Sequence, residues 1–83
     1  MNRVEKAVEK MRQSPAAVRF DNLCLVCDHY FGAARQHSGS QRIYKTPWAG
    51  DPRVNIQKGD GGKAKPYQVK QVLSAIAKLE VSP

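Results

Sequence analysis

Basic side chains gather around a short Gly-Ser turn in the middle of this 83-residue chain. The turn residues are Gly39 and Ser40; His37 precedes them and Gln41 follows them. Three cations flank the turn, namely Arg35, Arg42 and Lys45. Guanidinium and ammonium groups bind phosphate oxygens, and a histidine can accept or release a proton near neutral pH. The segment therefore predicts a phosphate-binding site, although one histidine alone does not establish catalysis.

Two aromatic residues of the same region, Tyr44 and Trp48, could stack on a nucleic-acid base. An aromatic side chain at a strand position more often packs in the core, and we expect this of Tyr44. Trp48 lies in a turn between Pro47 and Gly50, where an aromatic side chain is less often buried than in a strand. Base stacking is the alternative for both rings.

A second group of cations lies in the loop 59–66, just before the last predicted helix. Lys63 and Lys65 stand beside the N-terminus of that helix, which carries about half a positive charge and normally attracts acidic residues. Two cations there are unfavourable unless an anion joins them, so the loop predicts a phosphate held by backbone N–H groups and both lysines. The alternative is a solvated loop whose lysines point away. The spacing of a nucleotide-binding P-loop is missing.

The two cysteines, Cys24 and Cys27, could supply zinc ligands together with His29 and His37. Both cysteines, however, share an apolar helical stripe, and free cysteine is among the most buried residue types. A tetrahedral site would also require the two histidines to converge across Gly32 and a change of secondary structure. We therefore expect both cysteines to pack in the core, with zinc binding as the alternative.

Hydrophobic spacing predicts the elements that must position these residues. Apolar residues recur three and four positions apart in 2–13, in 20–31 and from Pro66 to Leu79, the period of an amphipathic helix. Pro15 and Gly32 should end the first two helices. Short strands are expected near 34–37, 41–45 and 53–57. The order α-α-β-β-β-α predicts an α+β fold, in which helices cover one face of a three-stranded antiparallel sheet.

The charge of the chain is uneven. Its net charge is +7, and residues 33–70 hold eight basic and two acidic residues, a balance of +6. Such a segment attracts a polyanion, with an ordinary basic surface as the alternative. The length predicts a single domain over 1–83. Because no apolar run approaches the roughly 20 residues of a membrane span and no signal-peptide core is visible, we expect a cytoplasmic protein.

Three short motifs occur in a fixed order along the chain. Arg35-Gln36 leads into Gly39-Ser40-Gln41-Arg42-Ile43-Tyr44, the polar strand Val54-Asn55-Ile56 follows, and a lysine-rich loop runs into Lys65-Pro66 and an amphipathic helix. In this combination the chain, from about Arg19 to Leu79, resembles HicA-type toxins, the RNA-cleaving members of bacterial toxin–antitoxin pairs. The resemblance implies a fold similar to double-stranded-RNA-binding domains over 19–79, with the helix within 1–14 as an addition.

The resemblance also implies a function. It suggests an endoribonuclease that requires no metal or organic cofactor and acts on mRNA in the bacterial cytoplasm. It also suggests a HicB-type antitoxin protein that covers the basic face. By this resemblance five residues would hold RNA phosphates: Arg35, Arg42, Lys45, Lys63 and Lys65. Gly39 and Ser40 would shape the turn that presents position 41.

One departure from the family pattern bears directly on catalysis. The family has a histidine after Gly-Ser or Gly-Thr, essential for cleavage, and this chain has Gln41. Glutamine can hydrogen-bond RNA but cannot move a proton, so turnover should fall by on the order of 10²–10⁴. Either Gln41 is an inactivating substitution, natural or deliberate, or His37 has taken over, because the two positions can face one another on a tight hairpin.

Three other classes of protein are alternatives to the toxin. A non-catalytic RNA-binding module would recognise duplex shape and backbone. A DNA-binding regulator would need a base-reading helix, and no helix-turn-helix pattern is apparent. A zinc module would need the cysteine and histidine ligands described above.

Overall fold

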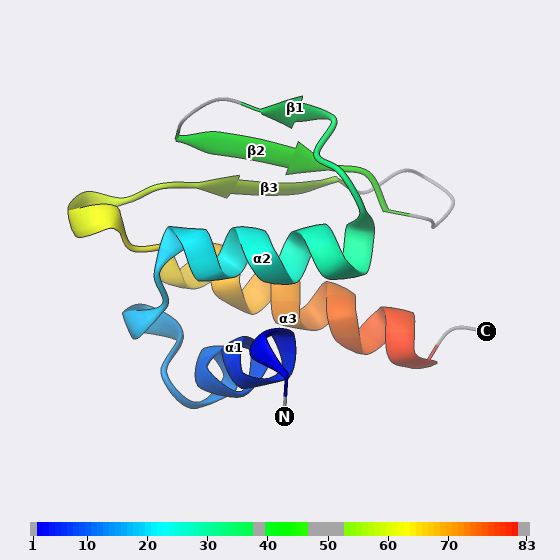
Figure 1. Cartoon of the computed structure of the whole chain (residues 1–83), viewed down its shortest axis with the longest axis horizontal. Coiled ribbons are helices and arrows are strands. Elements are labelled where there is room, and N and C mark those ends of the chain that lie inside the picture. Colours follow the sequence, from blue (N-terminus) through cyan, green and yellow to red (C-terminus); the bar gives the residue numbers. More distant parts are fainter. Residues whose placement is uncertain (1, 38–39, 47–52, 82–83) are drawn as a thin grey trace.

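The computed structural model describes residues 2–37, 40–46 and 53–81. Its helices are α1 at Arg3–Gln13, α2 at Phe20–Phe31 and α3 at Pro66–Val81 (Figure 1). Its strands are β1 at Gln36–His37, β2 at Gln41–Tyr44 and β3 at Val54–Gln57. Short 3-10 turns occupy Pro15–Ala17 (η1) and Asp60–Gly62 (η2). The predicted α+β class is confirmed, and Gly39 and Trp48 lie outside the described residues.

The helix ends follow from local chemistry. The side chain of Asn2 caps α1 by accepting a hydrogen bond from the Glu5 backbone N–H at 2.8 Å. α1 stops at Ser14, before Pro15, as expected. α2 stops at Gly32, whose φ of 79° is a conformation that glycine adopts without a steric penalty. The predicted ends of both helices are therefore confirmed.

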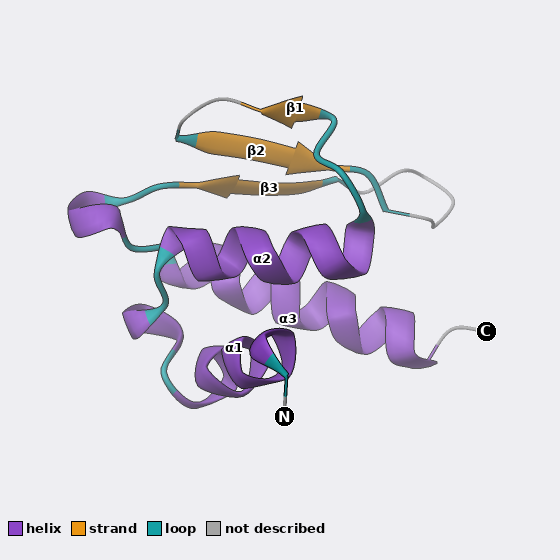
Figure 2. Ribbon diagram, in the orientation of Figure 1, coloured by secondary structure: helices purple, strands orange, loops and turns teal. Residues whose placement is uncertain are grey.

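The strands form one antiparallel sheet in the order β1-β2-β3, with β1 only two residues long. α2 and α3 lie on the same side of this sheet, and α1 packs against both of them on the side away from the strands (Figure 2). The molecule thus has a sheet layer, a layer of two helices and a third layer that consists of α1. Within the described residues, no helix is long and apolar enough to cross a membrane.

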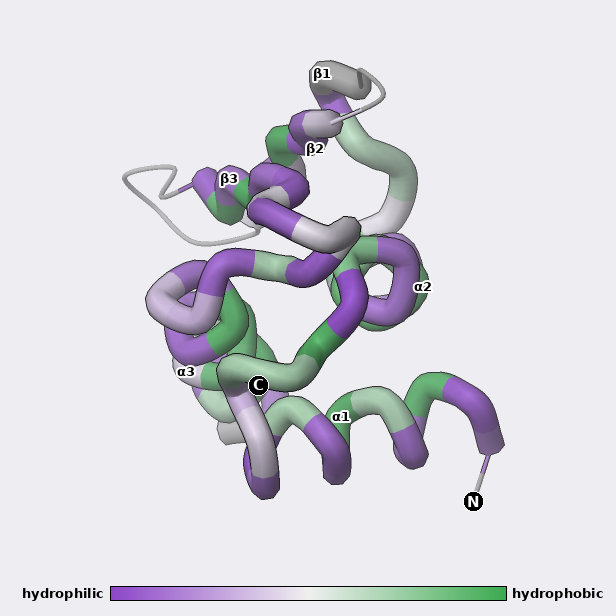
Figure 3. Tube along the Cα trace, turned by 90° about the vertical axis from the view of Figure 1, so that its left-hand side faces the viewer, coloured by the Kyte–Doolittle hydropathy of each residue, from purple (hydrophilic) through white to green (hydrophobic). Residues whose placement is uncertain are grey.

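The core lies between these layers and includes side chains from all three helices. Val8 and Met11 of α1 are buried together with apolar residues of α2, β2, β3 and α3. Figure 3 shows hydrophobic residues along each helix. Cys24 and Cys27 are free and buried in this core. The expected core packing of the cysteines is therefore confirmed, and α1 is part of the core rather than an appendage.

Candidate functional site

Position 41 lies at the first residue of β2, on the face of the sheet away from the helices. Gln41 pairs with Gln57 of β3 in the register of the sheet. Tyr44 and Ile56 are fully buried, so the alternation of the strands places the register pair Gln41 and Gln57 on the opposite, open face. The Gln41 amide Nε2 donates to Asn55 Oδ1 at 3.3 Å. We call this surface, formed by Gln41, Ile43, Asn55 and Gln57, the open face.

The strand end at position 41 is tied to the end of β3. The carbonyl oxygen of Ser40 accepts a hydrogen bond from the Lys58 backbone N–H at 2.8 Å. Residues 41 and 57 are therefore held side by side at the same end of the open face. Gly39, which was expected to shape the turn, lies outside the described residues.

His37 does not pair with position 41. The register of β1 and β2 sets His37 opposite Arg42 and Gln36 opposite Ile43. The expectation that positions 37 and 41 face one another across the hairpin is therefore wrong. The physical reason is that the turn length sets the register of a hairpin, and the sequence alone did not fix the turn.

Arg42 belongs to the helix-facing side of the sheet, where it reaches Asp28 of α2. Its Nη1 lies 3.4 Å from Asp28 Oδ2, and its side chain is 24% exposed. The hydrogen bond with Tyr44, with a smaller contribution from Asp28, raises the pKa of Arg42, so the guanidinium stays charged. Its Nε is buried and has no hydrogen-bond partner among the described residues. Arg42 is thus engaged within the fold, unlike the exposed cations.

Tyr44 packs in the core, as expected. Its ring is fully buried, with its centroid 6.3 Å from that of Phe31, and its hydroxyl donates to Asp28 Oδ1 at 2.6 Å. Burial, followed by the hydrogen bond to Asp28, raises the pKa of this phenol. Tyr44 therefore offers no face to a base, and Trp48 lies outside the described residues.

The other cations of the hairpin are exposed. Arg35 and Lys45 both lie at the surface, and the backbone N–H of Arg35 donates to the Ile43 carbonyl at 2.7 Å. Lys45 follows the last residue of β2, and exposed Arg53 precedes the first residue of β3. Since Tyr44 pairs with Val54, Lys45 and Arg53 meet at the end of the sheet opposite to Gln41. The sequence had not singled out Arg53, although strand pairing predicts such a neighbour.

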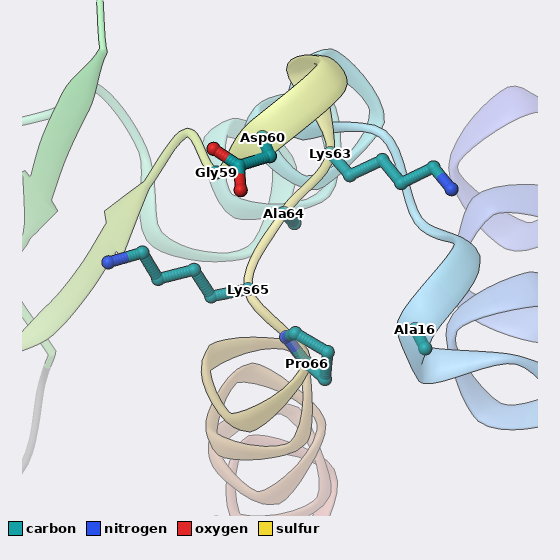
Figure 4. A pocket seen from close by; sticks show the side chains of 7 residues that line it. All are labelled: Ala16, Gly59, Asp60, Lys63, Ala64, Lys65 and Pro66. Carbon is teal, nitrogen blue, oxygen red and sulfur yellow. The ribbon is translucent and has the colours of Figure 1, made fainter.

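The two lysines of the predicted phosphate loop point in different directions. A pocket of about 460 Å³ is lined by Ala16 and by residues 59, 60 and 63–66. Figure 4 shows the Lys63 ammonium turned toward η1, and the Lys65 ammonium turned toward β3 on the other side. Lys65 Nζ donates to Gln57 Oε1 at 3.1 Å. The structure does not bring the two lysines onto one anion, and the Asp60 carboxylate lines the same pocket.

Two glutamines at the site were missed by sequence reasoning. The side chain of Gln57 accepts the hydrogen bond from Lys65. Gln68 of α3 is only 4% exposed, and its Oε1 accepts a hydrogen bond from the backbone N–H of Gln57 at 2.7 Å. Neutral amides carry no charge signal, so only the register of the sheet and the position of α3 reveal these contacts.

No metal-binding cluster appears in the part of the chain that the structure describes, where three or more His, Cys, Asp or Glu side chains never gather. Comparisons with protein-family models, with curated proteins and with solved structures found no match. The geometry of the site is an open sheet face with Gln41 at one end, Lys65 beside it, and Lys45 and Arg53 at the other end.

Proposed function

We propose that this chain is an RNA-cleaving toxin of the HicA type, attenuated because glutamine stands at position 41. One observation carries the proposal: Gln41 lies on the open face at the start of β2, next to the hydrogen-bonded pair of Gln57 and Lys65. A side chain at this place can meet RNA without displacing a helix. The exposed cations around it supply the attraction for phosphates. The fold we propose for residues 19–79 is that of double-stranded-RNA-binding domains.

The chemistry of the site explains why position 41 decides the activity. In metal-free cleavage the 2′-hydroxyl attacks the adjacent phosphorus, its proton goes to a base, and the departing 5′-oxygen takes up a proton from an acid. Histidine can perform either transfer near neutral pH. The Gln41 amide can hydrogen-bond a phosphate oxygen or a base but transfers no proton. With Gln41 in place of histidine, the chain therefore binds RNA and cleaves it slowly.

The partners follow from the same proposal. The substrate is mRNA, held through its phosphates by the exposed Arg35 and Lys45 and by the half-buried Lys65. Lys63 and Arg42 would contact phosphates away from the open face, because Lys63 extends toward η1 and Arg42 lies on the helix-facing side of the sheet. The protein partner is a HicB-type antitoxin that covers the basic surface. Both would meet the chain in the bacterial cytoplasm.

Cleavage of a labelled mixed-sequence RNA in the presence of a chelator tests the proposal. The unaltered chain is compared with Gln41→His, and Gln71→His places the same new side chain at an exposed position of α3 as a matched control. We expect Gln41→His to cleave RNA, and Gln71→His to behave as the unaltered chain does. If the two histidine variants cleave equally or not at all, position 41 is not the catalytic position.

The second candidate is a non-catalytic RNA-binding module. It is favoured by the amide of Gln41, which is held by Asn55 and has no proton to transfer. Binding of RNA by both the unaltered chain and Gln41→His, without cleavage by either, would support it. Residual cleavage by the unaltered chain that is lost in His37→Ala would instead assign the proton transfer to His37.

A further inference from the structure

The Lys65 ammonium is held beside position 41 by a neutral amide. Gln57 is the cross-strand partner of Gln41, and its Oε1 accepts a hydrogen bond from Lys65 Nζ at 3.1 Å. Directly opposed residues of an antiparallel pair have Cβ atoms about 4.5–5.5 Å apart. A phosphate next to residue 41 is therefore within reach of an ammonium group that is bonded to residue 57.

The two elements that carry this contact are fixed to one another. The backbone N–H of Gln57 donates to the Oε1 of buried Gln68 at 2.7 Å, which ties the end of β3 to the first turn of α3. Lys65 precedes Pro66, the first residue of α3, and its carbonyl accepts the backbone N–H of Val69 at 3.1 Å. Both partners of the Lys65–Gln57 hydrogen bond thus start from anchored backbone, so the distance between the two backbones does not change when the side chains rearrange.

Lys63 provides the contrast within the same loop. It is exposed, and its side chain extends toward η1 and away from the strands (Figure 4). The intervening Ala64 is buried, and its backbone N–H donates to the Val18 carbonyl at 2.8 Å, which fixes the backbone between the two lysines. The loop therefore presents one lysine to the open face and the other to a different surface.

We propose that Gln57 is a positioning residue that holds Lys65 beside position 41, so that one RNA phosphate contacts both, while Lys63 meets RNA elsewhere. This inference rests on the proposed function and narrows it to the scissile phosphate. The ammonium stabilises the negative charge that grows on the phosphate oxygens during attack. An amide orients the ammonium without neutralising it, whereas a carboxylate at position 57 would compete with the phosphate.

A double-mutant cycle on RNA binding tests the coupling of Gln57 and Lys65. Gln57→Met keeps the length of the side chain and the backbone bond to Gln68 but removes the acceptor. We expect Lys65→Met to weaken binding of a labelled RNA several-fold and to reduce the slope of log affinity against log salt by about 1. Gln57→Met should weaken binding in the unaltered chain and have no further effect once Lys65→Met is present. Lys63→Met is the matched control, and its effect should add to that of Gln57→Met.

Cleavage kinetics in the Gln41→His background distinguish a lysine that acts at the reacting phosphate from a lysine that only attracts RNA. Lys65→Met should lower kcat by on the order of 10², whereas Lys63→Met should raise KM and leave kcat unchanged. Additive effects of Gln57→Met and Lys65→Met, or an equal loss of kcat in Lys63→Met, would overturn the inference. If Gln41→His cleaves nothing, the proposed function fails, and the binding cycle still decides whether Gln57 positions Lys65.

Discussion

Asp28 joins two side chains of β2 that the sequence treated separately. One carboxylate oxygen accepts the Tyr44 hydroxyl at 2.6 Å, and the other lies 3.4 Å from Arg42 Nη1. The phenol is buried, whereas the Asp28 carboxylate is half exposed and keeps contact with water. The buried Tyr44 hydroxyl therefore needs Asp28 as its hydrogen-bond acceptor, whereas the Asp28 carboxylate can accept hydrogen bonds from water instead.

Tyr44→Phe should lower the free energy of unfolding by about 1.5–3 kcal/mol, because the variant loses the hydrogen bonds of the hydroxyl with the charged groups of Asp28 and Arg42. Urea denaturation measures the change. Tyr30→Phe, on the same helix as Asp28, is the matched control and should stay within about 0.5 kcal/mol. An equal loss in both variants would show that the bond to Asp28 contributes nothing specific.

The pH dependence of stability follows from the buried Cys27 thiol. Burial raises the pKa of Cys27 above its ordinary value of 9.0, so the unfolded chain releases this proton at a lower pH than the folded chain. The stabilisation is fully present below pH 9 and is lost as the pH rises further. We expect the thiol to account for a fall of about 1 kcal/mol in the free energy of unfolding between pH 9 and pH 10.

Cys27→Ala removes the titrating thiol, so the free energy of unfolding of the variant should fall by about 1 kcal/mol less between pH 9 and pH 10. The smaller side chain should also lower the free energy of unfolding by the same amount at every pH. Burial likewise raises the pKa of Cys24 and of Tyr44, so some alkaline loss should persist in the variant. Urea denaturation at several pH values gives the two curves. Parallel curves between pH 9 and pH 10 would contradict the assignment to Cys27.

For single residues, the sequence predicted burial, which depends on residue type. It did not predict the side-chain hydrogen-bond partners, which depend on how the elements pack. Burial of both cysteines followed from apolar periodicity, burial of Tyr44 followed from the usual packing of aromatic residues in strands, and both expectations are confirmed. The partners of Tyr44 and Lys65, namely Asp28 and Gln57, lie 16 and 8 positions away along the chain. Nothing in local spacing predicts such pairs, because they depend on how β2 meets α2 and how β3 meets α3.

Among the elements, α1 is the one whose role the sequence left open. The resemblance implies that α1 is an addition to a minimal fold, and the structure shows that this helix contributes to the core, because Met11 is fully buried and α1 contacts both α2 and α3. Met11→Ala should therefore cost about 2–5 kcal/mol, through lost burial and the cavity left behind. The exposed Lys10→Ala is the control in urea denaturation. A cost below 1 kcal/mol for Met11→Ala would show that α1 is dispensable for the core.

The exposed edge of β3 is closed at one end by α3. The backbone N–H of Gln57, which points away from β2, is taken up by the side chain of buried Gln68. Gln68→Ala should lower the free energy of unfolding by about 1–3 kcal/mol and increase the hydrogen-exchange rate of the Gln57 amide. The exposed Gln71→Ala, on the same helix, should do neither. Unchanged exchange at Gln57 in Gln68→Ala would refute this capping contact.

The order and type of the elements could be read from the sequence, whereas their pairing could not. Proline, glycine and apolar spacing located both ends of the first two helices and the start of α3. The register that sets His37 opposite Arg42 depends on the turn between them, which has no pattern strong enough to fix its type. The opposite directions of Lys63 and Lys65 could not be predicted either, because two lysines separated by one residue in a loop can point to the same surface or to different surfaces.

At the scale of the whole molecule, charge and architecture point to one surface. Residues 33–70 carry a balance of +6, and they include the whole sheet and the loop before α3. The helices cover one face of the sheet, so the open face and its two ends are where a polyanion can approach. The open face is therefore the surface where we propose that RNA binds and is cleaved.

The most direct test of the proposed function is the rate at which one labelled RNA is cleaved, in chelator, by Gln41→His relative to the unaltered chain. We expect a ratio on the order of 10²–10⁴, with similar RNA affinity for the two proteins and cleavage that follows the titration of a histidine. A ratio near one, with RNA bound equally well by both, would contradict it and leave an RNA-binding module in place of the enzyme.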